Sequence, residues 1–308
     1  MIYINWVMNK KAMNSLSVIV PLYNQAQYVE ECLDALNKID NLYVEVIIID
    51  DYSRDASVER VSTWVEKNID TKLNVRFYKN ECNLGVCRTL NKGVKLSTHN
   101  IIYICAADDF PLPDVINNKV SLINESDYDA IISDVLIIDE KSKIVLNSGF
   151  KDYFHACPKA LESSKFLAGE VITNWCIPGP CLLIKKDVYM KIGFYNESLI
   201  AEDRDFYLRL FRHAKVLFDS ERVAAYRVHS SNISKSTVFR NNMNLEIRKI
   251  NYSYASEWEG IYKLYLKSYG LSLISESKLC IFYSMLGSIV RKVLRLLFIL
   301  KVYFSHGK

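Results

Sequence analysis

Two adjacent carboxylates, Asp108 and Asp109, offer the clearest chemistry in this sequence of 308 residues. They follow the apolar run Ile101–Ala107, which is typical of a buried strand, and a Phe-Pro pair comes directly after them. Neighbouring carboxylates at the end of a buried strand repel each other and lose hydration, so they need a compensating charge. A divalent cation that bridges them to phosphate would supply it. The alternative is a solvated turn that caps a helix beginning near Asp114.

Strand and helix patterns alternate before this pair. Apolar strands are expected over 16–22, 43–49, 74–78 and 101–105, and helices over 25–38, 56–67 and 85–96. Such alternation predicts an α/β fold, with βαβ units that form a mostly parallel sheet flanked by helices on both faces. Right-handed crossovers place the carboxyl ends of these strands at one edge, where open sheets of this kind bind their ligands.

Polar residues stand at three of the predicted strand ends. Residues Pro21–Asn24 end the first strand, Asp50 and Asp51 end the second, and Asp108 and Asp109 follow the fourth. These strand ends are therefore expected to converge on one crevice, a coincidence that solvation alone does not predict.

The pattern changes after residue 125. Strands are expected over 130–138, 144–146, 181–184 and 223–228, and helices over 158–167 and 202–213. No low-complexity linker or internal repeat separates these segments. We therefore expect one domain over 13–235, with halves that meet near residue 125, and a helical C-terminal extension over 236–308.

Composition narrows the class of protein. A net charge of +4 is small for this length, so binding to nucleic acid is not expected. Eight cysteines show neither a C-x-x-C pair nor the spacing of a zinc site, which favours a reduced, cytosolic chain. The first 14 residues lack the apolar core of a signal peptide, and residues 1–12 are either a lead-in or a mis-assigned start. The sequence contains no stretch of eighteen uncharged apolar residues, so a transmembrane helix is not expected.

Seven short motifs, in order along residues 15–235, resemble those of the family 2 glycosyltransferases, which have the Rossmann-like GT-A fold. They are Ser17–Asn24, Asp50–Asp55, Asn83–Gly93, Ala106–Asp109, Gly193–Glu197, Glu202-Asp203 with Arg209, and Tyr226–His229. Each motif is weak alone, whereas seven in register are specific. The resemblance implies a nucleotide-sugar-binding half over 13–125 and an acceptor-binding half over 126–235.

This resemblance implies transfer of one sugar from a nucleotide-diphosphate sugar, with uridine as the expected base, and inversion at the anomeric carbon. The implied donor-binding residues are Pro21, Tyr23, Asn24, Asp50, Asp51, Asn83, Gly85, Arg88 and Asp108. Among them, Asp51 or Asp50 would accept a hydrogen bond from the base. Local physics offers plainer roles: the Asp50–Asp55 segment also fits a helix cap, and Arg88 also fits a surface salt bridge.

The implied cofactor is Mn²⁺ or Mg²⁺, with Asp109, Asp108 and His229 as its ligands. Many relatives carry an additional Asp where Ala106 stands, so here only the last two carboxylates of the motif remain. Arg227 and Ser231 are expected to contact the diphosphate from the same loop as His229. The alternative for His229 is an ordinary structural histidine.

Asp203 is the implied general base, because glycosyl transfer needs a carboxylate within reach of the acceptor hydroxyl. Glu202 is expected to orient the acceptor, and Trp175 to stack on an acceptor sugar. The plainer alternatives are carboxylates stabilised by a helix dipole and a tryptophan in the core. The acceptor itself is expected to be a glycan or a lipid-linked glycan in cell-surface polysaccharide biosynthesis.

The C-terminal tail has a different character. Over 279–304, a narrow polar arc contains Ser284, Ser288, Arg291, Lys292 and Arg295 at about 100° per residue, while apolar residues fill the rest. Basic amphipathic helices of this kind lie in the membrane interface, and each basic residue adds about 1 kcal/mol on an anionic leaflet. We therefore expect peripheral contact with the inner face of the cytoplasmic membrane. The alternative is packing on the catalytic domain or on a second subunit, in a homodimer through the C-terminal helices.

Two other classes remain open from the sequence. A nucleotidyltransferase shares the α/β topology, although it would usually carry a Gly-rich basic loop in place of Pro21–Asn24. A catalytically inactive module that binds sugar nucleotides or membranes is the alternative that is not an enzyme. The presence together of Asp108, Asp109, Asp203 and His229 argues against it.

Overall fold

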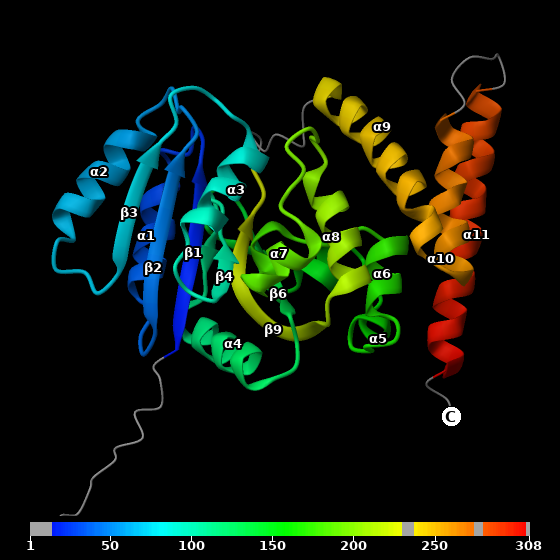
Figure 1. Cartoon of the computed structure of the whole chain (residues 1–308), viewed down its shortest axis with the longest axis horizontal. Coiled ribbons are helices and arrows are strands. Elements are labelled where there is room, and N and C mark those ends of the chain that lie inside the picture. The colour runs from blue at the N-terminus through cyan, green and yellow to red at the C-terminus, as the bar shows by residue number, and fades with distance from the viewer. Residues whose placement is uncertain (1–13, 230–236, 274–279, 306–308) are drawn as a thin grey trace, which may run out of the picture.

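The computed structural model describes residues 14–229, 237–273 and 280–305. Its first half alternates as the sequence predicts, with β1 (Ser15–Leu22), α1 (Val29–Asn37), β2 (Tyr43–Asp50), α2 (Ser57–Lys67), β3 (Asn74–Lys79), α3 (Val86–Leu96) and β4 (Ile101–Ile104). These four strands are parallel and lie in the order β3-β2-β1-β4. The order reverses between β1 and β4, so right-handed crossovers place α1 and α2 on one face and α3 on the other (Figure 1).

The second half continues the same sheet. Its elements are β5 (Phe110–Pro111), α4 (Pro113–Glu125), β6 (Ala130–Ile138), β7 (Ile144–Leu146), a π-helical turn (Gly149–Tyr153), α5 (Pro158–Leu161), α6 (Leu167–Thr173), a 3₁₀ turn (Gly179–Cys181), β8 (Leu182–Lys185), α7 (Asp187–Ile192), α8 (Glu202–His213) and β9 (Val216–Arg227). The sheet extends as β4-β8-β6-β9-β5, with β7 paired to β6. Strand β8 is antiparallel to both β4 and β6, whereas β9 is parallel to β6. The carboxyl ends of β6 and β9 therefore lie at the same edge as that of β1.

The core explains why the central strands read as continuous apolar runs. Both faces of β1 and β2 are covered, and Val18, Ile19, Val20 and Ile47 have no exposed surface. Pro21 lacks an N–H, but it stands beyond the last β1–β4 pair, Ile19–Ile104, and its carbonyl still accepts from the Ala107 amide at 3.3 Å.

Three elements differ from the sequence prediction. Helix α1 begins at Val29 rather than at 25, and the amides of Gln25 and Ala26 are hydrogen-bonded to the side chains of Ser57, the first residue of α2, and Asp55, at 2.8 and 3.0 Å. The helix expected over 158–167 divides into α5 and α6. Strand β9 begins seven residues earlier than expected, because a register shift carries the polar stretch 219–222 past Asp134 of β6.

The chain ends in helices packed beyond the sheet, namely α9 (Thr237–Tyr254), a 3₁₀ turn (Ala255–Glu257), α10 (Gly260–Lys267), a second 3₁₀ turn (Ser268–Leu273) and α11 (Cys280–Ser305). Helix α9 lies beside α8, and α11 forms the outer edge of the molecule (Figure 1). None of the helices in the described ranges is both long and apolar enough to cross a membrane.

An ion pair ties α11 to the body of the protein. The Arg295 guanidinium donates to both oxygens of Glu170 at 2.6 Å and to Thr173 Oγ1 at 2.9 Å. The Glu170 side chain is fully buried on α6, so the bidentate arginine compensates its charge. Arg291 also points inward, with its guanidinium 4.2 Å from the centre of the Tyr269 ring. These two arginines of the polar arc therefore face the protein, and the apolar arc faces outward.

Candidate active site

A cavity of about 700 Å³ opens at the carboxyl edge of the sheet, beside the point where the strand order reverses. Nine residues predicted for the site line it: Pro21, Tyr23, Asp51, Asn83, Gly85, Asp108, Trp175, Glu202 and Asp203. The other five predicted residues, Asn24, Asp50, Arg88, Asp109 and His229, are not in its lining. Three of the predicted strand ends contribute to this lining, through Pro21, Asp51 and Asp108, and residues from the second half of the sequence complete it.

The Asp51 carboxylate holds the rim of this cavity together. It accepts hydrogen bonds from the backbone amides of Leu84 and Gly85, both at 2.8 Å, and from Asn80 Nδ2 at 2.9 Å. Gly85 has a φ of 85°, in the left-handed region that glycine tolerates, and it precedes the first turn of α3. Asn83 Nδ2 completes the rim by donating to the Asp51 carbonyl at 3.2 Å.

Three of the predicted donor-binding residues have other partners. The Asn24 side-chain oxygen accepts from the Arg54 amide at 2.7 Å, and the Asp50 carboxylate accepts from the Ser53 amide at 3.2 Å. These two side chains stabilise the turns that follow β1 and β2. Arg88 forms an ion pair with Glu197 at 3.3 Å, with both side chains about half exposed. Exposed pairs of this kind contribute little to stability and leave the arginine able to change partners.

The acidic pair divides between the cavity and the protein interior. Asp108 faces the cavity, and its Oδ2 lies 3.0 Å from His229 Nε2. Asp109 is buried, its Oδ1 accepts from the Arg227 amide at 2.8 Å, and its pKa is raised well above the ordinary value by burial and by the charge of Asp108. In the described part of the chain, no three His, Cys, Asp or Glu side chains form a ready-made metal cluster.

Arg227 points into the protein rather than into the cavity. It is 1 % exposed and donates to the Asp108 carbonyl at 2.7 Å, to the Asp139 carbonyl at 3.0 Å and to Glu31 Oε2 at 2.6 Å. This guanidinium thus ties the acidic pair to α1 and to the turn after β6, which makes it a structural residue in this conformation. Ser231, expected beside it, lies outside the described residues.

The first turn of α8 carries Glu202 and Asp203 into the cavity. Asp203 is open to the cavity, yet the surrounding protein removes much of its hydration and raises its pKa to about 6. Loss of hydration, with the charges of Asp203 and Glu246, raises the pKa of Glu202 to about 8. The two neighbouring carboxyls therefore titrate as a pair, and Asp203 is the one that ionises first as the pH rises. No described residue donates a hydrogen bond to the Asp203 side chain, so both of its oxygens are available to a substrate.

The wall beyond these carboxylates is apolar and was not predicted. Leu199 and Ile200 form it together with Met243 and Ile247 of α9. Trp175, on the same side, is half-buried and packs edge-on against Tyr207 with ring centres 5.7 Å apart. Helix α9 was expected only as part of the helical C-terminal extension, because the sequence contains no motif that connects it to the strand ends.

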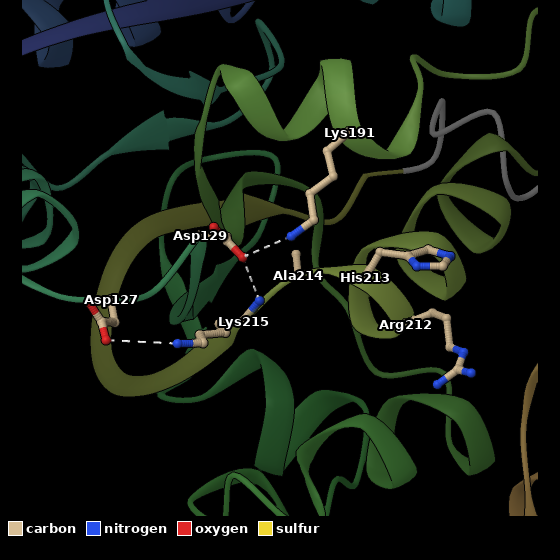
Figure 2. Close-up of a pocket in the computed structure, with 7 residues that line it drawn as sticks. All are labelled: Asp127, Asp129, Lys191, Arg212, His213, Ala214 and Lys215. Atoms are coloured by element: carbon tan, nitrogen blue, oxygen red, sulfur yellow. Dashed lines mark hydrogen bonds and ion pairs between the residues drawn. The ribbon is translucent and has the colours of Figure 1, made fainter.

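A second cavity, of about 550 Å³, lies at the opposite edge of the sheet, where β6 and β9 begin. Figure 2 shows the Asp129 carboxylate between the Lys191 ammonium, at 3.8 Å, and the Lys215 amide, at 2.8 Å. The Lys215 ammonium lies 3.8 Å from Asp127, so both lysines have acidic partners. The residues expected to do chemistry are absent from its lining.

Comparisons with known proteins identify the family of this chain. The model of glycosyl transferase family 2 matches residues 17–193. An uncharacterized glycosyltransferase of Rickettsia typhi is 26% identical over 227 residues, which cover 72% of this chain and 67% of the relative. The glycosyltransferase GlyG of Streptococcus pneumoniae is 22% identical, over 72% of this chain and 73% of its own length.

Two solved structures have a similar fold. TarS of S. aureus (residues 1–349), in complex with UDP-GlcNAc, has a TM-score of 0.60 at 20% identity, over 84% of this chain and 72% of that one. The mannosyltransferase PcManGT of Pyrobaculum calidifontis, in complex with GDP-Man and Mn²⁺, has a TM-score of 0.54 at 15% identity, over 91% of this chain and 86% of that one. The family match covers more than half of the chain, and the predicted GT-A fold is confirmed. The chain is a glycosyltransferase and belongs to glycosyl transferase family 2.

Proposed function

We propose that this glycosyltransferase moves one sugar, with inversion, from a nucleotide-diphosphate sugar to a hydroxyl of a glycan or lipid-linked glycan. The observation that carries the proposal is the Asp203 carboxylate, which shares one cavity with Asp108 and the rim held by Asp51. A donor bound along that rim would have its anomeric carbon between the strand ends and α8. An acceptor would then approach from the side of Trp175.

The chemistry of such a transfer needs one base. The ionised Asp203 accepts the proton of the acceptor hydroxyl, whose oxygen forms the new bond to the anomeric carbon. The bond from that carbon to the diphosphate breaks, and its electron pair leaves with the nucleoside diphosphate. Because attack and departure occur on opposite faces of the sugar, the configuration inverts. Glu202, whose pKa is raised by loss of hydration and by the charge of Asp203, is suited to donate a hydrogen bond to the acceptor when it is protonated.

The residues at the acidic pair fit a divalent cation. Asp109 is a buried carboxylate beside a second carboxylate, and a cation would relieve the repulsion that raises its pKa. Carboxylates suit Mn²⁺ and Mg²⁺ when phosphate and water complete the coordination, and an imidazole is a better ligand for Mn²⁺ than for Mg²⁺. We therefore assign Asp108, Asp109 and His229 to this role. When bound, the ion would stabilise the charge of the departing diphosphate.

Thermal shift with candidate donors tests the donor and the cation together. UDP-GlcNAc, which is bound in the TarS structure, and GDP-mannose are the first probes, each with Mn²⁺, Mg²⁺ or EDTA. A donor at 100 times its dissociation constant stabilises the fold by about 2.7 kcal/mol. We expect a uridine donor to raise the Tm of the wild type only when the cation is present. In Asp108→Asn, adding the cation should no longer increase the shift that the donor produces. A donor shift that is equal in EDTA would contradict the metal assignment.

We further propose that the protein acts at the inner face of the cytoplasmic membrane, in the assembly of a surface polysaccharide. The outward side of α11 carries an apolar stripe: Ile281, Phe282, Met285, Leu286, Ile289, Val293, Leu296, Leu297, Leu300, Tyr303 and Phe304. These side chains fall within an arc of about 160° along a helix of roughly 39 Å. Such a stripe is long and wide enough to lie in the membrane interface.

Charge favours a bilayer over a second copy as the partner. Within the described residues 260–273 and 280–305 there is no Asp or Glu. Lys292 and Lys301 are exposed at the two margins of the apolar stripe, where they would meet anionic headgroups. Two copies paired through this face would instead bring like charges together.

Flotation with vesicles tests this surface. We expect the wild type to float with vesicles that contain phosphatidylglycerol, and Leu296→Glu, at a position 58% exposed, to remain in the soluble fraction with an unchanged Tm. Val145→Glu is the matched control, since Val145 is 59% exposed on β7, away from the stripe. A dimer in solution that Leu296→Glu dissociates, without flotation of the wild type, would contradict the membrane assignment.

A further inference from the structure

Helix α9 contacts α8 through three polar side chains. Glu246 Oε2 accepts hydrogen bonds from the amides of Ile200 and Ala201, each at 2.6 Å. One turn further on, Asn251 Oδ1 accepts from Arg204 Nε at 2.7 Å, and the Tyr254 hydroxyl donates to Asp205 Oδ1 at 2.8 Å. The contact from Glu246 is made with two residues that line the cavity, Ile200 and Ala201.

The contact from Glu246 supplies a cap that α8 lacks in its own sequence. Ala201 is the N-cap residue and has no side chain that accepts a hydrogen bond. The first four amides of a helix, from the N-cap onward, have no partner within it, and here a carboxylate from another element accepts from the N-cap amide of Ala201 and from the amide of Ile200 just before it. Bonds of this kind to a charged acceptor are stronger than bonds between neutral groups.

The same face of α9 also forms part of the cavity wall. Met243 and Ile247 lie three residues before and one after Glu246, so all three side chains project toward the start of α8. The capped residues come directly before Glu202 and Asp203, and a shift of the backbone there would move both carboxylates.

We propose that Glu246 is a positioning residue for the transfer reaction. Its carboxylate fixes the backbone at Ile200 and Ala201, and through it the direction in which Asp203 projects into the cavity. The inference rests on the proposed role of Asp203 as base, and it makes α9, which lies beyond the matched residues 17–193, a part of the active site. A displacement of about 1 Å at a reacting group can reduce the rate about 100-fold.

Three variants separate positioning from general packing. Glu246→Ala removes both hydrogen bonds, and Glu246→Gln retains an acceptor oxygen. Tyr254→Phe is the matched control, because it removes a different hydrogen bond between the same two helices. The readouts are hydrogen exchange of the amides at Ile200 and Ala201, and kcat and donor KM with the donor identified by thermal shift. Ile200 is 38% exposed, so its amide should exchange rapidly once the carboxylate is lost.

We expect Glu246→Ala to speed exchange at these two amides at least tenfold and to lower kcat about 10- to 100-fold, with donor KM within twofold. Glu246→Gln should keep both the amide exchange rates and kcat close to those of wild type. Tyr254→Phe should change neither the exchange rates nor kcat. Unaltered exchange in Glu246→Ala, a kcat within twofold of wild type, or an equal loss in Tyr254→Phe would each overturn the proposal. A wild type that transfers no sugar to any acceptor would overturn the proposed function itself, whereas an active wild type with an equally active Glu246→Ala overturns only this assignment.

Discussion

The two ends of α8 meet two different cavities, and they differ in how their charges are balanced. At the amino end, Glu202 and Asp203 lie in the larger cavity, and loss of hydration raises the pKa of both carboxyls despite the favourable end of the helix dipole. At the carboxyl end, Arg212 and His213 line the smaller cavity, where the helix dipole favours cations and the neighbouring lysines have acidic partners. Unbalanced charge, more than volume, distinguishes the end of the helix that we propose acts on a substrate.

The largest expected effect comes from removing the base at the amino end. Asp203→Asn cannot accept a proton, so we expect kcat to fall by a factor of about 10² to 10⁴. The donor-induced rise in Tm should remain, because the rim held by Asp51 is untouched. In the wild type, kcat should rise with pH through about 6, as Asp203 loses its proton. Transfer at the wild-type rate by Asp203→Asn would show that Asp203 is not the general base.

Glu202→Gln tests the cost of the unbalanced charge itself. The pKa of Glu202 is about 8 in the folded protein, compared with an ordinary value of 4.5. Between these pH values the folded state binds more protons than the unfolded state, so stability falls as pH rises through that window. Glutamine cannot ionise, and we expect the Tm of this variant relative to wild type to increase from pH 5 to pH 8. A difference in Tm that is independent of pH would mean that Glu202 is ordinarily hydrated.

The smallest effect is expected at the carboxyl end. Arg212 is exposed, and its guanidinium lies 5.9 Å from the centre of the Trp258 ring. Arg212→Gln should lower the free energy of unfolding by about 0.5–1 kcal/mol through loss of this contact, and leave kcat within twofold. Tm and transfer rate are measured together to test whether the smaller cavity takes part in transfer. A tenfold loss of rate with an unchanged Tm would indicate that it does.

Much of the fold and part of the site follow from local patterns. Strands such as β1 and β2 are buried on both faces, so their apolar runs and terminal polar residues can be recognised without knowledge of the rest of the chain. That is why Pro21, Asp51 and Asp108 could be predicted to lie at one edge of an α/β sheet. The GT-A fold itself was expected from the resemblance of the seven motifs to family 2 glycosyltransferases. The reversed strand β8 was expected as a strand, but its direction depends on the chain path through α5 and α6.

Contacts over long distances in sequence could not be predicted. Glu246 caps amides 45 and 46 residues earlier, and no periodicity in the sequence connects a helix surface with a distant backbone. The side of α11 on which Arg295 finds its partner could not be predicted either, because that partner, Glu170, is 125 residues away in the sequence. Nothing in the sequence around Glu170 indicates that this carboxylate is buried. The sequence predicts an amphipathic α11, whereas the tertiary partner decides which side faces outward.

The hydrogen bonds of Asp51 have a consequence for the thermodynamics of donor binding. Both of its oxygens are already bonded to the amides of Leu84 and Gly85, so this rim is ordered before any nucleotide arrives. Ordering the backbone of a mobile loop would oppose binding by about 1–2 kcal/mol per residue, and this opposing entropy is largely absent here. Calorimetry should therefore report a small conformational entropy penalty for the nucleotide alone, and Asp51→Ala should weaken binding mainly through a less favourable entropy.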